Sequence, residues 1–273
     1  MSARATHAVV CSPALDLRTE PAHRAELGTQ LLLGEVVRLA GAARRGWRPV
    51  ESTVDGYRGW VREWGLVEAG AARARRWRQL ASARVAAPIA RVTARPGAGI
   101  AVAPLFLGSW LIASRRQGGQ RRVELPDGRC GWVDEGALAD RSAAPPDLEA
   151  RLLSLLGTPY LWGGRTPAGL DCSALVQLVL AEQGLALPRD AREQHAASRA
   201  LRAGESPRQG DLAFFRAPKE DVGHVGLALG GDLFVHSRGW VRVSSLDPVN
   251  PMCDKPLVPQ FVGWFRPRGR RVR

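Results

Sequence analysis

Cys172 follows Gly169-Leu170-Asp171 and opens an apolar run that predicts a helix over residues 172–183. The first turn of a helix offers unpaired backbone N–H groups and the positive end of the helix dipole, which favour a thiolate over a thiol. A cysteine in this position is a candidate nucleophile. We also expect its backbone N–H to help bind an oxyanion, with Tyr160 as a second donor.

Two histidines are spaced so that they can take part in proton transfer. Strand-like runs over residues 224–229 and 232–237 are separated by a Gly-Gly-Asp turn, which predicts a hairpin. His224 should start one strand and His236 should end the next, so their imidazoles should lie side by side. One ring could then take the thiol proton while the other orients it, which completes a set of nucleophile, base and orienting group.

The elements around these three residues follow a helix-then-sheet order. After Pro145-Pro146, helical periodicity covers residues 147–156 and returns at 172–183. Strand-like runs follow at residues 211–215, 224–229 and 232–237. Helices grouped before an antiparallel sheet predict an α+β domain, which we place at residues 147–268.

The first half of the chain contains an internal repeat. Residues 55–63 (Asp-Gly-Tyr-Arg-Gly-Trp-Val-Arg-Glu) are echoed by residues 127–135 (Asp-Gly-Arg-Cys-Gly-Trp-Val-Asp-Glu). Each copy is an Asp-Gly turn followed by a short Trp-Val strand, and short β-branched runs interrupted by Gly and Pro precede it. We therefore predict two small β-barrels, at residues 5–72 and 80–140, joined by the Ala- and Arg-rich segment 69–79.

The net charge of +13 arises from 39 Lys and Arg against 26 Asp and Glu. These basic residues are scattered, and no nucleic-acid recognition pattern accompanies them, so we expect no nucleic-acid partner. We expect no membrane association either, because no stretch is long and apolar enough to span a bilayer and residues 1–7 lack the apolar core of a signal peptide.

The four cysteines, at positions 11, 130, 172 and 253, have neither paired nor metal-ligand spacing. Free thiols are typical of a reducing compartment, so we expect a cytoplasmic protein; a periplasmic or extracellular one is the alternative if the true start lies upstream. We expect neither a metal nor another cofactor, because the sequence has no phosphate-binding loop and no Cys/His cluster.

Several short motifs together resemble the NlpC/P60 family of cysteine peptidases. They are Pro-Tyr-Leu-Trp-Gly-Gly at 159–164, Gly-Leu-Asp-Cys-Ser at 169–173, Gly-Asp-Leu at 210–212, Gly-His-Val-Gly at 223–226 and Val-His-Ser at 235–237. The resemblance implies a papain-like α+β fold and cleavage of bacterial cell-wall peptides, commonly between D-Glu and a diamino acid. It makes Cys172 the nucleophile, His224 the general base and His236 the orienting residue.

Two bacterial SH3-like barrels before such a domain resemble the γ-D-glutamyl-L-diamino acid endopeptidases of dipeptidyl-peptidase VI type. In those enzymes a loop Glu and a Tyr of the first barrel help hold the free amino group of an N-terminal L-Ala. The resemblance implies a substrate-binding set of Tyr57, Glu26 (or Glu20 in its place), Asp171, Asp190, Ser173 and Trp162. A buried ammonium needs carboxylates or a phenol to replace its water, which fits these residue types.

The sequence therefore predicts an endopeptidase that cleaves the γ-D-glutamyl–diamino acid bond of muropeptides with a free N-terminal L-Ala, releasing L-Ala-D-Glu for recycling. Two other interpretations stay open: an extracellular hydrolase acting on intact peptidoglycan, and a catalytically inactive wall-binding protein. The identity of the diamino acid and the oligomeric state are not specified by the sequence.

Overall fold

In the computed structural model, the sequence repeat of the first half corresponds to two sheets of the same topology. The structure describes residues 5–218 and 220–271. Residues 1–4, part of the segment expected to lack a signal peptide, lie outside the described residues. By its contacts the chain divides into two units, Met1–Ala143 and Ala144–Arg273.

The first sheet has the strand order β3-β2-β6-β5-β4-β1-β7. Its strands are β1 (His7–Val10), β2 (Ala14–Arg18), β3 (Leu27–Leu32), β4 (Val36–Leu39), β5 (Trp47–Ser52), β6 (Arg58–Arg62) and β7 (Leu66–Ala69). The second sheet has the order β10-β9-β13-β12-β11-β8-β14, which is the first order with every strand number raised by seven. Its strands are β8 (Ala83–Val85), β9 (Ile89–Arg95), β10 (Ala98–Phe106), β11 (Trp110–Gln117), β12 (Gln120–Glu124), β13 (Cys130–Asp134) and β14 (Leu138–Asp140).

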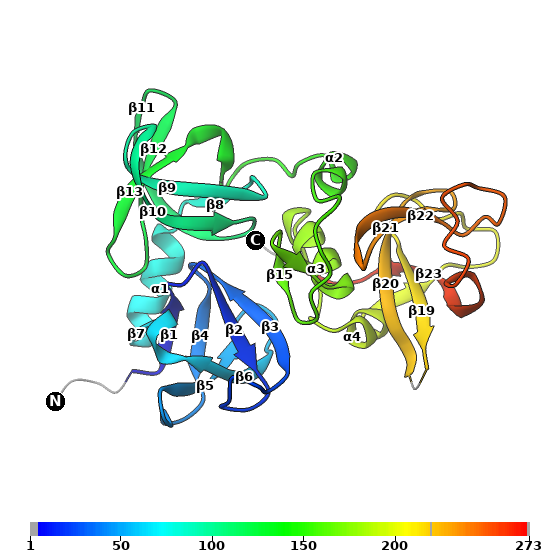
Figure 1. Cartoon of the computed structure of the whole chain (residues 1–273), viewed down its shortest axis with the longest axis horizontal. Helices are drawn as coiled ribbons and strands as arrows, with labels where there is room; N and C mark the ends of the chain where they lie inside the picture. Colours follow the sequence, from blue (N-terminus) through cyan, green and yellow to red (C-terminus); the bar gives the residue numbers. More distant parts are fainter. Residues whose placement is uncertain (1–4, 219, 272–273) are drawn as a thin grey trace. The chain divides into compact units, whose positions relative to one another are not determined.

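The segment between the two barrels is a helix, α1 (Ala71–Leu80), which lies beside both sheets in Figure 1. Trp77 of α1 is buried and donates a hydrogen bond from its indole Nε1 to the carbonyl of Gly34, at 2.9 Å. Gly34 has φ +87°, and a Cβ there would meet the carbonyl of Trp110 at 2.3 Å, so only glycine fits. Helix α1 therefore fastens the first barrel to the second.

The second unit contains a six-stranded antiparallel sheet of order β18-β23-β19-β20-β21-β22. Its strands are β18 (Ser198–Ala200), β19 (Leu212–Ala217), β20 (Glu220–Gly230), β21 (Leu233–Arg238), β22 (Trp240–Ser245) and β23 (Phe261–Pro267). Its helices are α2 (Leu148–Leu153), α3 (Cys172–Glu182) and α4 (Ala191–Ala196), and two small ribbons pair β15 (Arg165–Thr166) with β16 (Gly169–Leu170) and β17 (Leu185–Ala186) with β24 (Arg270–Arg271). This helix-then-sheet order confirms the predicted α+β class.

Helix α3 is buried along almost its whole length and packs against β20 and β21 (Figure 1). A mostly apolar helix that is buried on nearly every side belongs to the core, and this one carries the predicted nucleophile at its first residue. Two details differ from the sequence-based expectation. Helix α2 ends at Leu153 rather than at residue 156, and His224 lies inside β20 rather than at its start, because the strand begins at Glu220.

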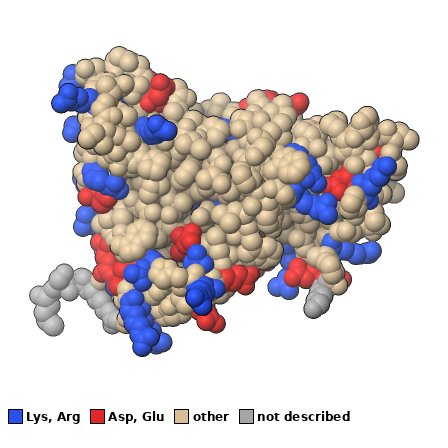
Figure 2. Space-filling model, in the orientation of Figure 1, with Lys and Arg blue, Asp and Glu red and all other residues tan. Residues whose placement is uncertain are grey.

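The basic residues on the face shown in Figure 2 are dispersed, as the sequence indicated. On the face in Figure 2, Lys and Arg form separate groups, most with Asp or Glu beside them. Among the described residues, none of the helices has the length and apolarity needed to cross a membrane.

Replacing Trp77 tests whether α1 holds the two-barrel unit together. We expect Trp77→Ala to lower the free energy of unfolding by about 3–5 kcal/mol, because it opens a cavity between the barrels and removes the bond to Gly34. Trp64→Ala, which removes an indole that is 66% exposed, is the matched control. Denaturant unfolding of the full chain measures both; equal midpoints for the two variants would contradict this role of Trp77.

Candidate active site

Asp171 sets the start of the helix that carries Cys172. Its Oδ1 accepts a hydrogen bond from the backbone N–H of Ala174 at 2.8 Å, which caps α3. Its Oδ2 accepts from the backbone N–H of Gly163 at 3.0 Å, and Gly163 has φ +73°, which favours glycine. The Gly-Gly turn before the nucleophile and the first turn of α3 are thus held by one carboxylate. Cys172 is 6% exposed at this junction.

The charge of Asp171 is balanced by Arg189. The guanidinium Nη1 and Nη2 lie 3.0 and 2.6 Å from the two carboxylate oxygens, and Arg189 is 2% exposed. Arg189 also donates to the Oγ of Ser173 at 2.9 Å. Two parallel bonds between a guanidinium and a carboxylate fix geometry as well as charge. Sequence reasoning missed Arg189; its place directly before the predicted Asp190 was the available signal.

His224 and His236 meet as the hairpin predicted. Strands β20 and β21 are antiparallel with Gly226 opposite His236, so His224 lies diagonally across from His236 on the same face. The Nε2 of His224 lies 2.8 Å from the Nδ1 of His236. A Cβ on Gly226 would come within 2.7 Å of the ring of Phe234 and 3.2 Å of the Cβ of His236. The glycine therefore leaves room for the second imidazole.

The backbone N–H of Val225, the residue after His224, points at the thiol of Cys172 and lowers its pKa. This contact places the sulfur against β20 at the residue next to His224. Because the Nε2 of His224 faces His236, the Nδ1 is the ring nitrogen that can take the thiol proton. That tautomer requires an N–H on Nε2, which donates to the Nδ1 of His236.

Cys172, His224 and His236 form a row of side chains. Two further residues lie behind His236 in this row, and sequence reasoning missed both. The Nε2 of His236 lies 3.0 Å from the Oγ of the buried Ser244, and 3.8 Å from an oxygen of Asp254. Asp254 in turn accepts from Arg238 at 3.1 Å and from Arg242 at 2.7 Å. With Nδ1 accepting from His224, His236 carries its proton on Nε2 and donates it to Ser244.

Burial keeps the reacting groups neutral, which corrects the expectation of a thiolate. Desolvation and then the nearby Asp171 raise the pKa of Cys172 to about 12, so they outweigh the helix start and the N–H groups that lower it. Desolvation and then the charge of Arg238 lower the pKa of His224 to about 4. Desolvation and then His224 lower the pKa of His236 to about 2. Both pKa shifts favour a neutral thiol beside a neutral imidazole.

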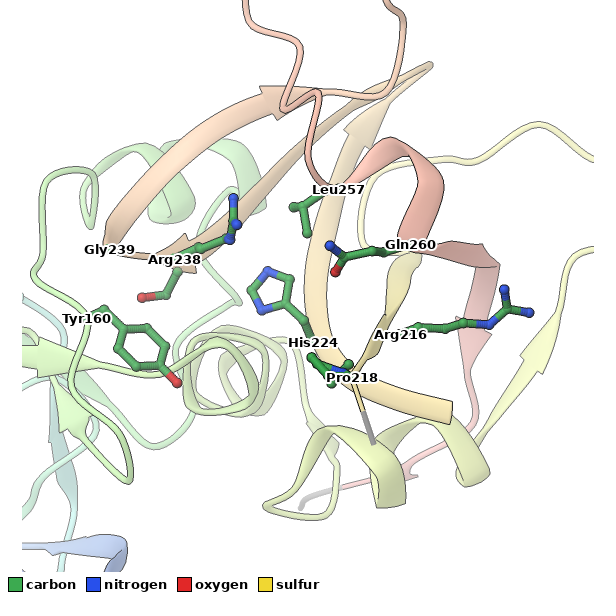
Figure 3. A pocket seen from close by; sticks show the side chains of 10 residues that line it. Tyr160, Arg216, Pro218, His224, Arg238, Gly239, Leu257 and Gln260 are labelled. Atoms are coloured by element: carbon green, nitrogen blue, oxygen red, sulfur yellow. The ribbon is translucent and has the colours of Figure 1, made fainter. Parts of the chain in front are cut away.

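Tyr160 lies close enough to Cys172 for the two side chains to interact electrostatically. Burial, followed by electrostatic coupling to Cys172 and Asp171, raises the pKa of Tyr160, so the phenol keeps its proton and stays a hydrogen-bond donor. Its backbone N–H donates to the carbonyl of Gly239 at 2.9 Å, which ties the loop to the end of β21. Tyr160 and His224 line the same pocket (Figure 3). This arrangement suits a donor to an oxyanion formed at the sulfur.

The remaining predicted substrate residues lie at the edge of the second unit or in the first barrel. Trp162 is 62% exposed, and Asp190 is an exposed residue directly before α4. In the first barrel, the ring of Tyr57 packs against Gly28, two residues beyond the exposed Glu26. Their roles toward substrate stay predictions. Among the described residues, no group of three or more His, Cys, Asp or Glu side chains could hold a metal ion.

Comparison with known proteins agrees with the motifs. Residues 157–259 match the model of the NlpC/P60 family, and residues 17–66 match that of the bacterial dipeptidyl-peptidase SH3 domain. A crystal structure of an NlpC/P60 family protein from Bacillus cereus ATCC 10987 superposes with a TM-score of 0.80 at 20% identity, covering 97% of this chain and 100% of that one. That likeness extends the shared fold over the barrels and the C-terminal unit together.

Two curated relatives are named as dipeptidyl-peptidases. Dipeptidyl-peptidase 6 of Lysinibacillus sphaericus is 37% identical over 108 residues, which is 38% of each chain. Gamma-D-glutamyl-L-lysine dipeptidyl-peptidase of Bacillus subtilis is 39% identical over 84 residues, which is 30% of this chain and 28% of the relative. The chain aligns with 28% to 49% of the length of the curated relatives considered.

A pH titration tests the neutral thiol–imidazole pair. Between about pH 5 and 8 we expect no ultraviolet thiolate absorbance that is present in the wild type and absent from Cys172→Ala. Turnover should fall only as the pH drops through about 4, where His224 takes a proton and can no longer act as base. A thiolate signal at pH 6 that disappears in Cys172→Ala would show a preformed ion pair instead.

The Ser244 hydroxyl should act through His236 rather than on substrate. Ser244→Ala removes the acceptor for the His236 Nε2–H, and we expect kcat to fall about tenfold with KM little changed, since a lost buried hydrogen bond costs about 1–3 kcal/mol. Ser244→Thr should recover most of kcat because it keeps a hydroxyl. Ser198→Ala removes a hydroxyl bonded to the Gln194 carbonyl and serves as the control. An unchanged kcat in Ser244→Ala would remove Ser244 from the row.

Proposed function

Through its C-terminal domain the chain belongs to the NlpC/P60 family of cysteine peptidases, and we propose that it hydrolyses the γ-D-glutamyl–diamino acid bond of muropeptides that carry a free N-terminal L-Ala. The observation that carries this proposal is the row Cys172, His224, His236, in which the Val225 N–H brings the thiol to the base and a 2.8 Å contact joins the imidazoles. We propose Cys172 as nucleophile, His224 as base and His236 as its orienting partner.

The reaction follows from the neutral resting state. The thiol of Cys172 transfers its proton to the Nδ1 of His224 as the sulfur attacks the γ-carbonyl carbon of D-Glu. The hydroxyl of Tyr160 and the backbone N–H of Cys172 receive the oxyanion. His224 then gives its proton to the departing amino group of the diamino acid, which leaves a thioester on Cys172.

Water completes the cycle with the same groups. It loses a proton to the Nδ1 of His224 and attacks the thioester carbon, and a second oxyanion forms at Tyr160. Collapse of that intermediate breaks the carbon–sulfur bond and releases L-Ala-D-Glu, while Cys172 recovers its proton from His224. Throughout, His236 accepts a hydrogen bond from the Nε2–H of His224, which keeps the reacting nitrogen turned to the sulfur.

The dipeptidyl activity is supported by the barrel and by the relatives' names. The first barrel is of the bacterial dipeptidyl-peptidase SH3 type, and two relatives are named as dipeptidyl-peptidases. We assign the ammonium of L-Ala to Tyr57 and Glu26 of that barrel, with Asp171 and Asp190 as further carboxylates. A requirement for that ammonium restricts the substrate to peptides already cut from the glycan strand. The free cysteines suit action on such peptides inside the cell.

Paired peptides separate the chemistry from the specificity. We expect the protein to release L-Ala-D-Glu from L-Ala-γ-D-Glu-diaminopimelate and to cleave the N-acetylated peptide at least about a hundredfold more slowly, because acetylation removes the ammonium. Mass spectrometry of the products, with Cys172→Ala as the inactive control, measures both reactions.

Each other result has a definite meaning. Equal cleavage of the two peptides would retain the peptidase but overturn the roles of Tyr57 and Glu26. Cleavage of intact sacculi in preference to free peptides would favour a wall hydrolase. Cleavage of none of these substrates would favour a wall-binding protein.

A further inference from the structure

A pocket of about 240 Å³ lies beside His224, and its chemistry is not used by the nucleophile. It is bounded by the end of β19 with Pro218 after it, the end of β21 and the segment that carries Gln260 (Figure 3). Its lining includes His224 and Tyr160, whereas Cys172 is absent from it. The pocket therefore lies on the imidazole side of the row.

The chemistry of amide cleavage identifies what passes on that side. The imidazole that takes the thiol proton must return it to the departing amine, so the leaving residue has to contact His224. Its amine must also lie near the carbonyl carbon whose oxygen faces Tyr160. A pocket bounded by both side chains is therefore the place where the leaving residue fits.

The charged side chains lining this pocket are all cations apart from the titratable His224. Of the residues that the structure describes, Arg238 and Arg216 belong to the lining, and no Asp or Glu does. Arg238 pairs with Asp254, but Asp254 is shared with Arg242, so this group keeps a surplus positive charge. Arg216 is exposed, and among the described residues its side chain has no hydrogen-bond or ion-pair partner. A ligand carboxylate is the group that would balance the charge of these arginines and accept their hydrogen bonds.

We propose that this pocket binds the leaving residue and selects one with a carboxylate at the far end of its side chain, diaminopimelate rather than lysine. The inference rests on the proposed peptidase function and assigns its leaving-group specificity to Arg216, with Arg238 nearer the reacting bond. It separates this chain from the relative named for γ-D-glutamyl-L-lysine, whose leaving residue ends in an ammonium.

The positions of the side chains match the length of such a residue. In Figure 3, Arg238 stands next to His224, whereas the side chain of Arg216 extends outward from the rim beyond Pro218. The α-carboxylate of the leaving residue would lie near the reacting bond and hence near Arg238. The second carboxylate of diaminopimelate lies several bonds farther out, within reach of a flexible arginine at the rim. Lysine would bring its ammonium toward the same cations.

Three peptides that share L-Ala-γ-D-Glu test the proposal: one ends in meso-diaminopimelate, one in its monoamide at the distal carboxylate, and one in L-lysine. We expect kcat/KM to be about tenfold or more higher for the diaminopimelate peptide than for either of the others, as one charge-assisted contact allows. In Arg216→Gln the ratio of diaminopimelate to monoamide should fall to about one to threefold, through a higher KM for the former.

Arg208→Gln is the matched control, because Arg208 is an exposed arginine of the same unit outside the pocket. It should keep the wild-type ratio. Equal wild-type rates on the three peptides would overturn the proposal, and so would a ratio that Arg216→Gln leaves unchanged.

A binding experiment keeps the subsite testable if the wild type cleaves none of the peptides, a result that would reject the proposed function itself. Free meso-diaminopimelate is titrated into Cys172→Ala, with and without Arg216→Gln, and chemical shifts are followed by NMR. Binding that weakens several-fold on loss of Arg216 would support the subsite independently of turnover. Binding that is absent or unaffected by the substitution would overturn it.

Discussion

The site depends on one buried ion pair, Asp171 with Arg189. Asp171 caps α3, contacts Ser173 in its first turn and holds Gly163 of the turn before it, so two segments converge on one carboxylate. An unpaired carboxylate at this depth would cost several kcal/mol, and Arg189 offsets that cost from the segment leading into α4. The first residue of α3 has little freedom to move once this pair is formed, and that residue is Cys172.

The same burial decides how the proposed chemistry must work. A helix start acting alone favours a thiolate, but at Cys172 desolvation and the neighbouring carboxylate dominate, and His224 loses basicity for the same reason. Neither group is activated by its charge at rest. Reactivity must then come from geometry: a sulfur held at the Val225 N–H, and an imidazole whose far nitrogen is fixed by His236. Displacing His236 should therefore impair catalysis as much as a change in the pKa of Cys172 or His224 would.

Sequence patterns predicted what is local, and they failed where partners come from distant segments. The Asp-Gly turns revealed both barrels, and a short turn between two apolar runs placed His224 near His236 on the neighbouring strand, because hairpin register follows from turn length. Ser244 and Asp254 were missed, since each reaches His236 through tertiary packing that leaves no periodic signal. Arg189 was missed because a buried arginine looks like any other in an arginine-rich chain. The thiol pKa was misjudged because desolvation depends on the complete fold.

The positive charge of the chain can orient a substrate only where the fold brings several arginines together. Many arginines pair with Asp or Glu, but beside His224 two of them share Asp254 and a third stands at the rim without a partner among the described residues. The proposed peptide has an ammonium at its L-Ala end and carboxylates at its diamino acid end. Cations on the leaving side would attract one end of that peptide and repel the other, so the field around His224 itself favours a single direction of binding.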